Sequence, residues 1–222
     1  MASRKASVAT PGYEHSVFVN APFDAEFLPL LHAILFTTHD AGFVARLAVE
    51  EVGGRELRLH RILRLIRESR LSIHDLSRVD SRNPAGLPRF NMPFECGLAL
   101  GAIEFEKVRR NARQRNYLVL VAEPFQDQKT TSDLAGQDSS AHHNEIPRVI
   151  AAVRRFLSAQ KPEGEETRGA AEIGRRFDSF NTTALLPEAA RVGIGPDEIQ
   201  SFDYIREWLQ AAVAWQKANN KA

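Results

Sequence analysis

The sequence has only one cysteine, Cys96, among its 222 residues, so it cannot form an intrachain disulfide. It also lacks an apolar run long enough to cross a membrane, and the N-terminal stretch "MASRKASVATPGYEHS" has no apolar segment of the kind found in signal peptides. These absences predict a cytoplasmic protein without membrane contact. An excess of one charge is missing too, because 29 basic side chains stand against 28 acidic ones, so a nucleic-acid partner is not expected.

Two nucleotide-binding motifs are also missing. No GxGxxG follows the first apolar segment, and no GxxxxGK[ST] occurs anywhere in the chain. The sequence therefore does not predict a Rossmann-type dehydrogenase or a P-loop enzyme. Acidic and histidine residues gather between Asp133 and Glu145, but their spacing matches no standard metal motif, so no metal site is predicted.

What the chain does contain is a regular alternation of short apolar runs with amphipathic segments. The runs are rich in β-branched and aromatic residues, as in buried parallel strands, and the segments between them repeat their apolar residues at helical spacing. Strands are expected within 16–24, 43–50, 70–77 and 115–124, and helices within 27–42, 53–69 and 89–105.

This order of elements predicts an α/β protein with right-handed crossovers around a parallel sheet. The expected architecture is a flavodoxin-like, doubly wound sheet of about four to five strands in the order 2-1-3-4, with a C-terminal helical extension. Residues 1–15 are expected to form a flexible arm, 16–160 the α/β domain, and 161–222 the extension packed on it. Residues 125–145 read as a long polar loop in which no convincing fifth strand is recognised. The sequence leaves open whether its "SDLAGQD" segment is a lid over the site or a docking surface.

Polar residues follow the predicted first and third strands, whose carboxyl ends meet where the strand order reverses. Ligands of open parallel sheets bind at this position. Each residue has a structural alternative: Asp24 suits an N-cap, Asp75 suits a turn cap, and Arg46 suits a solvated surface. The candidate binding residues are Asn20, Pro22, Phe23, Asp24, Arg46 and Asn91, with Asp75 beside them.

Glu95 is the one charged residue in a helical stretch that is otherwise apolar or small from Met92 to Ile103. An acid near the start of a helix gains about 0.3–1 kcal/mol from the helix dipole, which is the structural alternative. Burying an unpaired charge costs several kcal/mol, however, and the neighbouring residues leave the helix no wide polar face. A cavity that requires a carboxylate therefore explains Glu95 best.

Three segments together resemble a known superfamily. "VFVNAPFDAEFLPLL", "SIHDLS" and "FNMPFECGLALG" are similar to the pattern shared by TIR-like domains and nucleoside 2-deoxyribosyltransferase-like proteins of bacteria, over roughly residues 16–124. The longer signature, including the 125–145 loop, resembles an uncharacterised bacterial subset of that superfamily.

The resemblance implies an N-glycosidase. In it Glu95 corresponds to the carboxylate that attacks or stabilises the anomeric carbon, while Asp75 would donate a proton to a neutral leaving base. Asn91 would hold a ribose hydroxyl or orient the carboxylate. Phe23 would stack on a base, and Arg46 or Arg58 would pair with phosphate. Arg89 stands where the transferases usually carry an aspartate, which favours hydrolysis of NAD over base exchange.

The expected function is cleavage of NAD to nicotinamide and ADP-ribose, with antiphage defence as the biological role and no cofactor required. The alternatives are a non-catalytic nucleotide-sensing module and a TIR-type protein-interaction module. Expected partners are a nucleotide or nucleoside ligand and a second copy of the chain or another protein.

Overall fold

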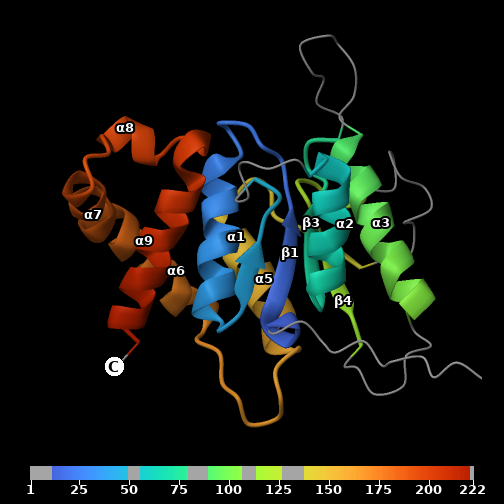
Figure 1. The fold of residues 1–222 in the computed structure, drawn as a ribbon. Coiled ribbons are helices and arrows are strands. Elements are labelled where there is room, and N and C mark those ends of the chain that lie inside the picture. Colours follow the sequence, from blue (N-terminus) through green and yellow to red (C-terminus); the bar gives the residue numbers. More distant parts are fainter. Residues whose placement is uncertain (1–11, 50–55, 80–89, 107–113, 127–137, 221–222) are drawn as a thin grey trace, which may run out of the picture.

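The computed structural model describes residues 12–49, 56–79, 90–106, 114–126 and 138–220. Within these ranges five parallel strands form one sheet in the order β2-β1-β3-β4-β5 (Figure 1). The predicted doubly wound α/β architecture and the strand order 2-1-3-4 are therefore confirmed. The strands are β1 (Ser16–Asn20), β2 (Val44–Arg46), β3 (Leu71–Asp75), β4 (Asn116–Val121) and β5 (Ser139–Ala141).

Helices cover both faces of the sheet (Figure 1). On one face lie α1 (Leu28–Asp40) and α5 (Ile146–Ser158), and on the other α2 (Arg58–Glu68) and α3 (Asn91–Glu106). Every residue of β1 and β3 is buried as a result, including the polar residues Ser72, His74 and Asp75 of β3. The second face is closed by a small cluster in which Phe18 of β1 packs with Ile62 of α2 and Ala99 of α3.

The fifth strand lies inside the stretch that the sequence predicts as a polar loop. β5 is only three residues long and pairs with β4 at the edge of the sheet. Its sequence, Ser-Ser-Ala, has no apolar alternation, and each of its residues is only partly buried. Pairing through the backbone thus creates a strand that no side-chain pattern could indicate. Residues 127–137 of the predicted loop lie outside the described residues.

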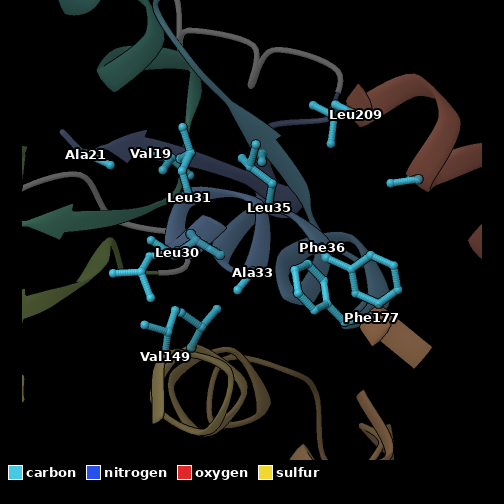
Figure 2. Close-up of a cluster of buried hydrophobic side chains, with 14 of the residues drawn as sticks. Val19, Ala21, Leu30, Leu31, Ala33, Leu35, Phe36, Val149, Phe177 and Leu209 are labelled. Carbon is cyan, nitrogen blue, oxygen red and sulfur yellow. The ribbon is translucent and has the colours of Figure 1, made fainter. Parts of the chain in front are cut away.

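The C-terminal extension packs against α1 and α5. It contains α6 (Ala170–Ser179), a π-helical turn (Phe180–Ala184), α7 (Leu185–Arg191), α8 (Pro196–Ile199) and α9 (Ile205–Ala218). Phe36 of α1 meets Phe177 of α6 edge to face, with ring centroids 5.5 Å apart (Figure 2). The same hydrophobic cluster includes Val19 of β1 and Trp208 of α9, so the sheet and the extension share one core.

A buried ion pair reinforces this attachment. Asp40, at the end of α1, has a fully buried side chain and accepts a hydrogen bond of 2.9 Å from Nε of Arg176 on α6. Arg168 approaches the same carboxylate at 3.6 Å. Arg176 also lies over the ring of Trp215, 5.1 Å from its centroid. One carboxylate thus links the α/β domain to two points of the extension.

Another contact between α1 and α9 is a stacked pair of rings. His32 and Trp208 lie 3.9 Å apart and 3° from parallel, and both are buried. Among the described residues, neither Nε2 of His32 nor Nε1 of Trp208 has a hydrogen-bond partner. Burial lowers the pKa of His32 to about 3. The imidazole is therefore neutral at pH 7.

The two ends of the chain are only partly described. Tyr13–His15 form a 3-10 turn before β1, and most of the predicted N-terminal arm, residues 1–11, lies outside the described residues. A membrane-spanning helix is not found in the described ranges, where each helix is too short or too polar to span a bilayer.

Replacing Asp40 should loosen the extension. Asp40→Ala leaves Arg176 in a largely buried position without its carboxylate, and breaking such a pair typically costs about 3–5 kcal/mol. Urea denaturation should show this loss, whereas Asp178→Ala, on the exposed side of α6, should change the free energy of unfolding by less than about 0.5 kcal/mol. Equal effects of the two substitutions would contradict the structural role of Asp40.

His32 should make the protein sensitive to acid. Because the folded pKa lies below the unfolded value near 6.5, the unfolded state binds more protons, and stability falls as the pH drops from about 6.5 toward 3. At pH 5 the loss from His32 amounts to about 2 kcal/mol. His32→Phe keeps a flat ring against Trp208 and should remove that part of the loss, measured by urea denaturation at pH 7 and pH 5. An unchanged difference between the two pH values would show that His32 does not titrate this way.

Candidate functional site

The carboxyl edge of the sheet gathers the polar residues that the sequence singles out. In the parallel register Asn20 of β1 lies opposite His74 of β3, and Asp75 follows at the end of β3. α3 begins at Asn91 on the same edge and carries Glu95. Residues separated by more than seventy positions are thereby placed around the point where the strand order reverses.

Asn20 ties three elements together. Its Nδ2 donates hydrogen bonds to the carbonyl oxygen of Met92 at 2.8 Å and to Nδ1 of His74 at 3.1 Å. Because Nδ1 accepts, the proton of this imidazole is on Nε2, which donates to Oγ of Ser72 at 2.9 Å. Burial lowers the pKa of His74 to about 3, so the ring is neutral. The Asn20 amide, only 2% exposed, fixes the start of α3 on the sheet.

Asp75 is completely buried and accepts three hydrogen bonds. Oδ1 accepts from the backbone N–H of Ser77 at 2.9 Å and from its hydroxyl at 2.5 Å. Oδ2 accepts from Nε2 of His142 at 3.1 Å, and Nδ1 of His142 accepts from the N–H of Asn144. The carboxylate thus joins the end of β3 to the turn after β5, in which His143 and Asn144 have φ values of 52° and 56°.

This cluster contains Ser, Asp and His but is not arranged as a catalytic triad. The hydroxyl of Ser77 donates to the carboxylate and makes no bond to the imidazole, so no base is placed to activate it. Adjacent histidines in a loop suggest solvated side chains, and for His142 this interpretation is wrong, since the ring is fully buried. No group of three metal-binding side chains occurs in the portion of the chain that the structure describes.

Glu95 lies one turn inside α3 with only 7% of its side chain exposed. Its Oε1 is 3.6 Å from a guanidinium nitrogen of Arg58, the first residue of α2. Burial raises the pKa of the Glu95 carboxyl, and the charge of Arg58 works in the opposite direction. The side chain of Arg58 is 57% exposed. The site is thus a desolvated carboxylate faced from one side by a solvated arginine.

One small cavity among the described residues lies away from Glu95. It lies at the amino edge of the sheet, lined by residues that include Arg70, Leu71 and Arg115, and its volume of about 10 Å³ holds no more than one water molecule. The hollow predicted beside Glu95 is not part of it. Residues 50–55 and 80–89, which follow β2 and precede α3, lie outside the described residues, and Arg89 is among them.

Three further predicted binding residues, which follow β1, make contacts within the fold or are buried. Phe23 meets Phe202 of the extension edge to face at 5.5 Å, and Pro22 is buried. Asp24 accepts a 3.0 Å hydrogen bond from the N–H of Phe27 and thereby caps the turn before α1. These contacts are structural, as the capping alternative for Asp24 anticipates.

Two others lie near solvent. Arg46 is 3.6 Å from Glu68 of α2, away from the point of reversal, and Asn91 is exposed at the start of α3. The edge therefore brings Asn20 to the first turn of α3, which carries Asn91 and Glu95. Asp75 bonds instead to His142, and Phe23 and Arg46 have partners within the fold. Ligand binding by any of these residues stays a prediction.

Substitution of two asparagines, one buried and one exposed, tests which of them stabilises the fold. Asn20→Ala leaves the Met92 carbonyl and the His74 ring nitrogen without their donor and should lower the free energy of unfolding by about 1–3 kcal/mol. Asn91→Ala, at an exposed position, should leave stability within about 0.5 kcal/mol of the parent. Denaturation curves of both variants test this, and a stable Asn20→Ala protein would refute the bridging role.

No family model, no curated protein and no solved structure matches this chain. The similarity of its three motifs to TIR-like and deoxyribosyltransferase-like proteins thus remains an expectation, and the chemistry of the carboxyl edge is what bears on function.

Proposed function

We propose that this chain is an N-glycoside hydrolase that cleaves a nucleotide, with NAD as the expected substrate and Glu95 as its catalytic carboxylate. The observation that carries the proposal is the desolvation of Glu95 at the carboxyl edge of the sheet. Its side chain is 93% buried, and among the described residues its charged partner is a solvated arginine. A carboxylate held solely for stability would be expected to have several close hydrogen-bond donors, as Asp75 does.

Loss of a base from a ribosyl group builds positive charge on the anomeric carbon. A carboxylate close to that carbon offsets this charge, and it does so more strongly where water is excluded. Burial supplies the low-dielectric surroundings of Glu95, while Arg58 favours its charged form. In the free protein the charge of Arg58 opposes protonation of Glu95, and burial keeps the carboxylate poorly solvated during the reaction.

The proposed reaction balances with water as the only co-reactant. The bond between C1′ and the nicotinamide nitrogen breaks, and its electron pair neutralises the cationic pyridinium. A water oxygen then bonds to C1′ and releases one proton, which Glu95 accepts and passes to solvent. The products are nicotinamide, ADP-ribose and a proton.

No acid is needed for this leaving group, because it departs as a neutral molecule. The proposal therefore assigns no step to Asp75, whose oxygens are already engaged by Ser77 and His142. Asn91, exposed one turn before Glu95, is the residue proposed to hold a ribose hydroxyl. A role in antiphage defence, through depletion of NAD, is part of the proposal.

Glu95→Gln should abolish the chemistry without harming the fold. Loss of the negative charge should lower kcat for release of nicotinamide from NAD by roughly 100-fold or more. The free energy of unfolding at pH 7 should be equal to or above the parent value, because burial is the larger influence on the Glu95 pKa and opposes the charged form. Chromatographic detection of nicotinamide and urea denaturation measure the two effects.

Glu104→Gln, at an exposed position of the same helix, is the matched control and should retain full activity. If Glu95→Gln unfolds the protein, or if the variant and the parent release nicotinamide equally, the carboxylate is not catalytic.

A second candidate function is nucleotide sensing without turnover. The contact of Arg58 with Glu95 favours it, because a charge pair across α2 and α3 can change with ligand binding and needs no chemistry. Calorimetric binding of NAD with no product after prolonged incubation would support sensing over hydrolysis.

A further inference from the structure

The contact between Arg58 and Glu95 joins two side chains of very different exposure. Glu95 is held in the interior by α3, with 7% of its side chain exposed, whereas the side chain of Arg58 is 57% exposed. The 3.6 Å separation is too long for a hydrogen bond, so the pair is a loose ion pair. Ion pairs that reach into solvent contribute about 0–1 kcal/mol. Arg58 can therefore leave this position at small cost, while Glu95 cannot.

Other arginines of the same region are held more firmly. Arg61 donates a 3.1 Å hydrogen bond to the carbonyl oxygen of Ala48. Arg64 donates to both oxygens of Glu56 at 3.1 and 3.2 Å and also approaches Glu68. For Arg58, in contrast, the described residues provide the loose contact with Glu95 and no closer acceptor. Of Arg58, Arg61 and Arg64, Arg58 is thus the guanidinium with the greatest capacity to take another anion.

We infer that Arg58 is a phosphate-binding residue that covers Glu95 until a phosphorylated ligand draws it away, so that the site accepts nucleotides and excludes free nucleosides. This inference rests on the proposed function, since it specifies the substrate class of the same site. A phosphate or pyrophosphate offers a guanidinium two parallel charge-assisted hydrogen bonds, which are shorter and stronger than the present contact.

The arrangement implies a coupling between the phosphate and the carboxylate. Glu95 and the ligand phosphate compete for one guanidinium, so each weakens the binding of the other to Arg58. A nucleoside has no phosphate to attract Arg58, so Arg58 stays over Glu95. Neutralising Glu95 should correspondingly make Arg58 more available to phosphate.

The first experiment compares two substrates that share one scissile bond. NAD and nicotinamide riboside both carry nicotinamide on C1′ of ribose, but only NAD has a pyrophosphate. The parent protein should cleave NAD with a kcat/KM at least about tenfold above that for nicotinamide riboside, a factor that corresponds to about 1.4 kcal/mol. Arg58→Ala should lower the value for NAD and raise the value for nicotinamide riboside, so that the two converge.

The control for this comparison is Arg64→Ala, which removes an arginine from the same helix without touching Glu95. It should preserve the preference for NAD. Equal cleavage of both substrates by the parent protein, or an unchanged preference in Arg58→Ala, would overturn the inference while leaving N-glycoside hydrolysis in place.

The second experiment needs no turnover. Calorimetry with inorganic pyrophosphate should show binding to the parent protein and to Arg64→Ala, loss of binding in Arg58→Ala, and binding tighter by up to about fivefold in Glu95→Gln, the factor that corresponds to about 1 kcal/mol. If no variant cleaves either substrate, the proposed function fails, and this titration alone decides the role of Arg58. Pyrophosphate affinity that is identical in the parent and in Arg58→Ala would refute that role, provided that both proteins show the same thermal transition.

Discussion

In a parallel sheet every strand ends at the same edge, and this constraint arranges the molecule. It places the ends of β1 and β3 side by side, so that Asn20 can reach His74 and the first turn of α3 with one amide group. It also places Asp75 where the turn after β5 can meet it. Polar side chains at the ends of adjacent strands therefore lie close enough to form hydrogen bonds with one another.

Three buried carboxylates show how their partners decide their roles. Asp40 has a close arginine and a second one nearby, and it connects the α/β domain to the extension. Asp75 has three short hydrogen bonds and connects two strand ends. Glu95, within the part of the chain that the structure describes, has a longer contact with an arginine side chain that is 57% exposed. Burying a carboxylate without hydrogen-bond donors is costly. Such a carboxylate is typical of a site at which a ligand interacts with it.

The two buried histidines, unlike the carboxylates, avoid the cost of a buried charge by staying neutral. His32 and His74 remain inside because they are neutral, one against Trp208 and one between Asn20 and Ser72. Burial lowers both pKa values to about 3, so each ring resists protonation in the folded state. The core is consequently stable at neutral pH and becomes weaker as protons bind preferentially to the unfolded chain.

The apolar runs and the helical periodicity of the sequence were sufficient to predict four strands and the helices between them, and the crossover rule for parallel strands led from these elements to the order 2-1-3-4. They also singled out Glu95 as a charge in an apolar helix. The sequence could not predict β5, whose three small residues pair only through their backbone, nor that His142 would be buried against Asp75. The partner of Glu95 was likewise decided by tertiary structure, since α2 and α3 are distant in sequence and only their packing on one face of the sheet brings Arg58 to the carboxylate. Periodicity records which residues avoid water, whereas the pairing of polar groups depends on geometry that forms after the chain has folded.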